Sequence, residues 1–121
     1  MEAKDYRLPD GSCIISEEVI AGIAVNAAQE VAGVAGMAAK PNDLRGLVGS
    51  SAAKSVRVLN TDNETVLDVY VNLKQGARIP EVAGRVQHCV KSAVQSMTGK
   101  PVTKVNVHVV GIKAEEEKDK P

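Results

Sequence analysis

Histidine, cysteine, serine and carboxylate side chains are the groups of this sequence that could do chemistry. The two histidines are His88 and His108. A histidine that acts as a general base is commonly oriented by a nearby carboxylate. His88 instead lies near Arg85 and Lys91, and His108 has no carboxylate two residues away along its strand. Structural or solvent-exposed roles are therefore predicted for both histidines.

Metal binding and nucleophilic catalysis receive no support from the spacing of the other reactive residues. Cys13 and Cys89 are far apart in sequence and match no zinc-ligand spacing, and no serine lies in a G-x-S-x-G turn. Acidic residues gather only at Glu17-Glu18 and in the last residues of the chain. We expect two reduced thiols in a cytosolic protein, no cofactor, no metal ion and no enzymatic activity.

Two surfaces remain as candidates for binding a partner. The first is a basic helix face with Arg85, His88 and Lys91, preceded by Arg78. Its positive field could attract an acidic protein or anionic lipid headgroups, and an ordinary solvated face is the alternative. The second is the polar face of the predicted sheet, which is either wet or covered by another copy. Its residues are Asp68, Tyr70, Asn72, Asn106 and His108.

Residues 40–54, KPNDLRGLVGSSAAK, predict a mobile loop because proline, glycine and polar turn formers are frequent there. Successive backbone N–H groups in GLVGSSAAK could cradle an anion, but the P-loop pattern is not met. Gly46-Leu47-Val48-Gly49 has the form of the GXXG clamp of KH domains, although that clamp joins two helices. A ligand-binding loop is therefore the alternative interpretation.

Length and composition indicate one domain with an aliphatic core. The chain has 121 residues and a formal net charge of zero, and its only aromatic residues are Tyr6 and Tyr70. Neither an overall positive field nor a stacking platform points to nucleic acid, so no nucleic-acid partner is expected. No apolar run approaches the ~20 residues that cross a bilayer. The first residues also lack the apolar segment of a secretion signal.

Two amphipathic helices organise the chain. The first is predicted over residues 17–32, with Ser16 as its N-cap and Gly33 at its end. Its predicted buried residues are Val19, Ile20, Ile23, Ala24, Ala27 and Val31. The second begins at Pro80 and is stopped by Gly99 and Pro101. Its predicted buried residues are Val82, Val86, Cys89, Val90, Ala93, Val94 and Met97.

Five segments are predicted as strands. They are residues 11–15, 34–38, 55–59, 65–73 and 102–112. The strands at 55–59 and 65–73 form a hairpin around a turn at 60–63, and apolar residues alternate with polar ones along the later strands. One apolar sheet face and two one-sided helices fit together as a two-layer α+β sandwich.

The predicted element order is (β)-α-β-β-β-α-β, with both helices on one face of a mainly antiparallel or mixed sheet. Residues 1–10 are expected to be a flexible N-terminal segment, 11–112 a single domain, and 113–121 a disordered charged tail.

Three stretches together resemble the alkaline shock protein family of Gram-positive bacteria, which acts in the envelope stress response. The stretches are ISEEVIAGIAVNAAQEVAGVAGM, TVLDVYVNLKQGARIPEVAGRVQHCVKSAVQSMTGKPV and KVNVHVVGI. The most diagnostic parts are Gly33-Val34, residues 76–82, Met97-Thr98-Gly99 and Val105-Asn106-Val107. The chain departs from the family at Lys74-Gln75, where an aromatic residue is frequent before the glycine, and in the unremarkable charge of residues 40–54.

The resemblance implies a non-enzymatic cytoplasmic protein of cell-envelope homeostasis, without catalytic residues. Self-association is common in the family, and some members are held at the inner face of the membrane by a separate membrane-anchored protein. The ending VNVHVVGI is similar to the branch encoded beside acetyl-CoA carboxylase subunits, which implies a link to fatty-acid synthesis. The alternative from another class is a nucleic-acid- or anion-binding regulator that uses residues 46–54 and the basic helix face.

Overall fold

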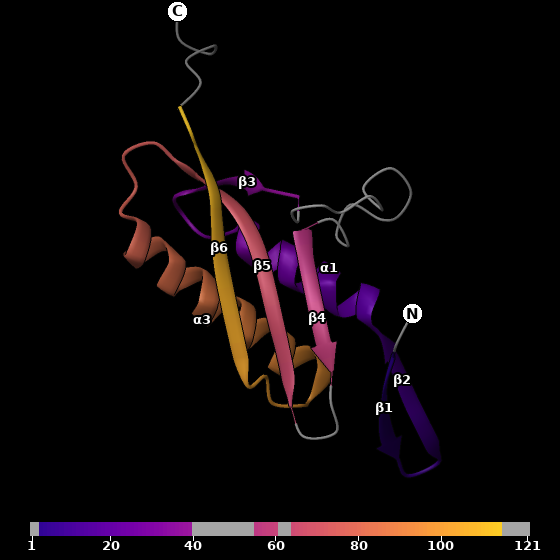
Figure 1. The fold of residues 1–121 in the computed structure, drawn as a ribbon. Coiled ribbons are helices and arrows are strands. Elements are labelled where there is room, and N and C mark those ends of the chain that lie inside the picture. Colours follow the sequence, from indigo (N-terminus) through magenta and orange to yellow (C-terminus); the bar gives the residue numbers. More distant parts are fainter. Residues whose placement is uncertain (1–2, 40–54, 61–63, 115–121) are drawn as a thin grey trace, which may run out of the picture.

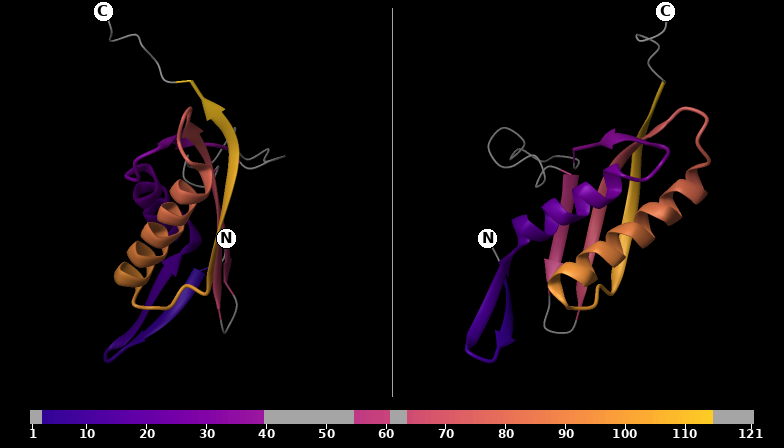
Figure 2. Two further views of the ribbon diagram at one scale, coloured as in Figure 1. Left: turned by 90° about the vertical axis from the view of Figure 1, so that its left-hand side faces the viewer. Right: turned by 180° about the vertical axis from the view of Figure 1, so that it is seen from behind.

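The computed structural model describes residues 3–39, 55–60 and 64–114. The elements in chain order are β1 (Ala3–Leu8), β2 (Gly11–Ser16), α1 (Glu17–Gln29), β3 (Val34–Met37), β4 (Val56–Asn60), β5 (Thr65–Lys74), α3 (Ile79–Thr98) and β6 (Lys104–Lys113). Helices α1 and α3 together cover one face of the sheet formed by β3, β4, β5 and β6 (Figures 1 and 2). The predicted α+β class and its two layers are confirmed.

Strand β5 is the centre of this sheet. Strand β6 runs parallel to it along one edge, from the pair Val66↔Lys104 to the pair Lys74↔Lys113. On the opposite edge, β4 pairs antiparallel with residues 65–69 of β5, and β3 pairs antiparallel with residues 71–73. The sheet is therefore mixed, and the hairpin predicted from residues 55–59 and 65–73 is confirmed as β4 and β5.

The core lies between the sheet and the helices and is aliphatic. Alternate residues of β5, Leu67, Val69, Val71 and Leu73, are fully buried because one face of the strand is turned toward the helices. Helix α3 contributes four valines spaced four residues apart, which therefore share one helix face. These valines are Val82, Val86, Val90 and Val94. Each such buried side chain stabilises the fold by ~1.5–3 kcal/mol.

Helix ends follow the predicted capping residues. The Ser16 hydroxyl accepts a hydrogen bond from the backbone N–H of Val19 at 3.2 Å. Gly99 has φ 76°, and its N–H donates to the carbonyl of Gln95, so this left-handed residue closes α3. Helix α1 ends at Gln29, earlier than the predicted 17–32, and a turn leads to Gly33.

Three residues predicted to be buried are exposed. Val19 is 52% exposed because the buried side of α1 is formed by Ile20, Ala21, Ala24 and Ala28. Met97 is 70% exposed because it occupies the last turn of α3, beyond the stretch of that helix whose valines are buried. Cys89 is also exposed, since it faces the gap between the helices rather than the sheet.

The N-terminal residues differ from the loosely ordered stretch expected over 1–10. Strands β1 and β2 form an antiparallel hairpin, from Ala3↔Ser16 to Leu8↔Gly11. The turn signal is Pro9-Asp10-Gly11, in which Pro fixes φ and Gly11 takes a φ of 144°. At the other end of the chain, Lys113 belongs to β6 rather than to a tail. Residues 40–54 and 115–121 lie outside the described residues.

Candidate partner-binding groove

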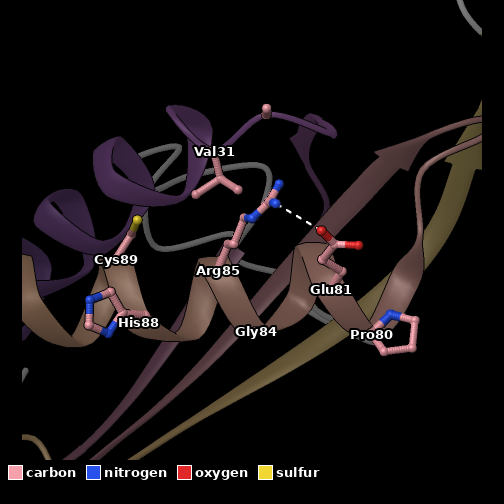
Figure 3. Close-up of a pocket in the computed structure, with 8 residues that line it drawn as sticks. Val31, Pro80, Glu81, Gly84, Arg85, His88 and Cys89 are labelled. Atoms are coloured by element: carbon pink, nitrogen blue, oxygen red, sulfur yellow. Dashed lines mark hydrogen bonds and ion pairs between the residues drawn. The ribbon is translucent and has the colours of Figure 1, made fainter.

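A groove lies between the end of α1 and the first half of α3 (Figure 3). Its volume is about 460 Å³. Most of its lining is apolar, and the charged side chains lie on the α3 side. The lining residues are Val31, Ala32, Pro80, Glu81, Gly84, Arg85, His88 and Cys89. An open apolar depression of this kind suits a side chain or short segment of another protein.

Two glycines explain why the groove forms here: Gly33, directly after the lining residue Ala32, and Gly84 in α3. Gly33 has φ 99°, and a Cβ on this residue would lie 2.7 Å from Cγ2 of Val82. Because only glycine tolerates this approach, the chain leaving α1 can pack directly against α3. Gly84, two residues after Val82 on α3, has no atom within 4 Å of its notional Cβ. The space that a larger side chain would fill therefore stays open.

The charges of the groove are paired. The guanidinium Nη2 of Arg85 lies 2.8 Å from Oε2 of Glu81, one turn earlier on α3. Figure 3 shows this pair, with the Arg85 side chain lying between Glu81 and Val31. Both side chains are about half exposed, 56% for Arg85 and 49% for Glu81, so the pair orients the arginine and adds little stability. The local field is weaker than three basic residues alone would produce.

The structure brings together two of the four residues predicted as a basic surface. Arg85 and His88 both line the groove. Arg78 is the exposed N-cap residue of α3 and makes no side-chain capping bond. Lys91 is exposed but lies six residues after Arg85, about 120° further around the helix, and does not line the groove.

Sequence reasoning missed the apolar part of this site. The lining residues involved are Val31 and Ala32, in the turn after α1, and Gly84 and Cys89, on α3. These two segments are distant in sequence. The available signal was a run of small residues where α1 ends, together with a glycine in the middle of a helix. A helical glycine costs stability relative to alanine and thus indicates a steric or functional reason.

The polar face of the sheet forms a hydrogen-bonded cluster. Asp68 Oδ1 accepts from Nδ2 of Asn106 at 2.9 Å and lies 3.2 Å from Nε2 of His108. The ring of His108 stacks on Tyr70, with centroids 4.4 Å apart and planes 10° apart. His108 therefore has a carboxylate partner across the strands, which a search along its own strand could not find. Four of the five residues predicted on this face therefore contact one another, on the side of the sheet opposite the helices.

The described residues were also compared with the requirements of a metal site, a disulfide and a membrane-spanning helix. Within residues 3–39, 55–60 and 64–114, no three His, Cys, Asp or Glu side chains converge as metal ligands. Both cysteines are free and exposed. In the same part of the chain, neither helix combines the length and apolar character needed to cross a bilayer. The alternative loop site at 46–54 lies outside the described residues.

Most of this chain matches the model of one protein family. The model of the alkaline shock protein 23 family, described as having a cell envelope-related function, matches residues 7–114. The chain belongs to this family. The resemblance inferred from the three sequence stretches is thereby confirmed, and the match covers both helices, all strands of the main sheet and the groove.

Relatives of similar length support the assignment. YqhY of Bacillus subtilis is 36% identical over 116 residues, which covers 93% of this chain and 83% of YqhY. YloU of the same organism is 34% identical over 113 residues, covering 90% and 94%. Among solved structures, a variant of MamM CTD has a TM-score of 0.48 and 17% identity, covering 83% of this chain and 99% of that chain.

Proposed function

We propose that this chain is a non-enzymatic interaction protein of cell-envelope homeostasis, which binds a protein partner through the groove and associates with itself. The groove between α1 and α3 carries the proposal. Its apolar lining would bury a side chain of the partner, and the Glu81–Arg85 pair would offer polar contacts at the rim. The envelope-related family supports the cellular setting.

The proposed partner is a protein at the inner face of the membrane, either a membrane-anchored protein or a subunit of acetyl-CoA carboxylase. In this proposal the chain itself is cytoplasmic and reaches the membrane through that partner. Nucleic acid is disfavoured by the zero net charge of the chain and by the pairing of Arg85 with Glu81.

Gly84→Leu tests the groove directly. The position has free space around it, so leucine would fill the groove while leaving the core unchanged. Gly22→Leu is the matched control, because Gly22 is also a helical glycine with no atom within 4 Å of its notional Cβ but does not line the groove. We expect affinity capture from a lysate of the native host, followed by titration of the recovered partner, to lose binding at least tenfold for Gly84→Leu alone. Equal binding by both variants would remove the groove from the proposal.

A second pair of variants separates the groove from a general basic face. Arg85→Gln removes a charge that lines the groove, whereas Lys91→Gln removes the same charge farther around α3. Partner affinity should fall for Arg85→Gln and stay near the wild-type value for Lys91→Gln. If both substitutions weaken binding equally and salt weakens it further, a diffuse positive field is responsible instead.

A further inference from the structure

The β1–β2 hairpin is poorly covered by the rest of the described chain. Figures 1 and 2 show it standing away from the two layers at the start of α1. No residue of β2 is buried, and Ile14 is 66% exposed. Ile15, the next residue, packs against the edge of the core and anchors the base of the hairpin. Because an isolated two-stranded hairpin is at best marginally stable in water, this arm needs a cover that residues 17–39, 55–60 and 64–114 do not supply.

Further large apolar side chains are exposed at the same end of the molecule. Val19 lies in the first turn of α1, Leu59 near the end of β4 and Met97 in the last turn of α3. Their exposed fractions are 52%, 46% and 70%. The end of β4 and the last turn of α3 lie on the side of the two layers from which the arm projects, and α1 begins directly after it (Figures 1 and 2). The same end of the folded molecule therefore carries both the uncovered arm and exposed apolar residues.

We propose that two copies of this chain pair about a twofold axis, with each β1–β2 arm lying against this apolar end of the other copy. The inference rests on the self-association included in the proposed function and specifies its surface. A twofold arrangement is self-complementary, so both arms and both apolar ends become covered at once. Six residues of strand reach about 20 Å, which lets an arm extend well past its own α1 onto a neighbour. Ile14 is the central contact of the arm.

Ile14→Ser and Ile112→Ser form a matched pair of tests. Both replace an exposed isoleucine, but Ile112 lies near the end of β6, at the opposite end of the sheet (Figure 1). Sedimentation equilibrium or light scattering over a dilution series gives the dimer dissociation constant of each protein. We expect Ile14→Ser to raise this constant about tenfold to one hundredfold, because an isoleucine side chain no longer becomes buried. Ile112→Ser should leave it unchanged.

Hydrogen exchange of the unmodified chain provides a second measurement that does not depend on a variant. Amides of residues 3–16 should be protected at concentrations where the dimer forms and should exchange rapidly after dilution to the monomer. Arm protection that is equal in monomer and dimer would overturn the inference, as would a dimer unaffected by Ile14→Ser. In those cases self-association itself survives. A wild-type chain that stays monomeric at high concentration would instead refute both the arm contact and the self-association of the proposed function.

Discussion

Gly33→Ala is expected to lower the free energy of unfolding by about 2–5 kcal/mol. Gly33 has φ 99°, and an L-residue in the left-handed region costs about 1–2 kcal/mol. The new Cβ would also lie 2.7 Å from Cγ2 of Val82, a side chain only 5% exposed. Overpacking of this kind costs about 1–3 kcal/mol because the neighbour has little room to move. The two contributions add to the stated range.

Urea unfolding followed by circular dichroism measures this change. Gly84→Ala is the control, since its position is helical and open, and alanine there should raise the free energy of unfolding by about 0.5–1 kcal/mol. Combining Gly33→Ala with Val82→Ala removes the atoms that clash. The double variant should therefore be more stable than the sum of the single effects predicts, by about 1–3 kcal/mol. Wild-type stability for Gly33→Ala, or strict additivity in the double variant, would refute the proposed close contact.

Three smaller predictions concern side chains that make hydrogen bonds. Ser16→Ala removes the N-cap acceptor of α1 and should cost about 1 kcal/mol in thermal unfolding; an unchanged midpoint would mean that the cap is replaced by water. Asp68→Ala leaves the side chains of Asn106 and His108 without their shared acceptor and should cost about 1–3 kcal/mol in urea unfolding, a result contradicted by a neutral effect. Gln87→Ala breaks the 2.9 Å bond from its Nε2 to the carbonyl of Val105, which ties α3 to the edge strand β6. It should cost about 0.5–1.5 kcal/mol and speed hydrogen exchange in β6, whereas unaltered exchange would show that the bond does not restrain the strand.

The residues of the groove that were identified from the sequence are those whose positions depend on neighbouring residues of one helix. Arg85 and His88 were identified from the sequence because they lie within one turn of each other on a strongly amphipathic helix. Lys91 was grouped with them by proximity in sequence, but helix geometry turns it away from the groove. The opposite wall, Val31 and Ala32, was not identified as part of a site. The residues next to them in the sequence do not indicate that a space remains between them and α3.

The same distinction explains the cluster on the polar sheet face. The period-two alternation of β5 and β6 correctly placed Asp68, Tyr70 and His108 on one face. Their contact depends on the parallel register that pairs Tyr70 with His108 across 38 positions of the sequence. A parallel pair of strands is joined by a long crossover, here α3, so no turn residue specifies that register.

The sequence contains a turn pattern for the N-terminal hairpin from which the hairpin was not predicted. Pro9-Asp10-Gly11 is a turn pattern with a physical mechanism, and it joins β1 to β2 as that mechanism predicts. The polar composition of residues 1–10 outweighed it in the sequence interpretation.

The sequence by itself determined the helices, most strands, the aliphatic core and the family, because caps, turns and apolar periodicity act between residues close together in the chain. Only the tertiary structure decided that β5 is central, that Asp68 meets His108, and that α1 and α3 leave a groove beside Gly84. Those features depend on contacts between distant segments, whose geometry is set by how all the apolar faces pack at once.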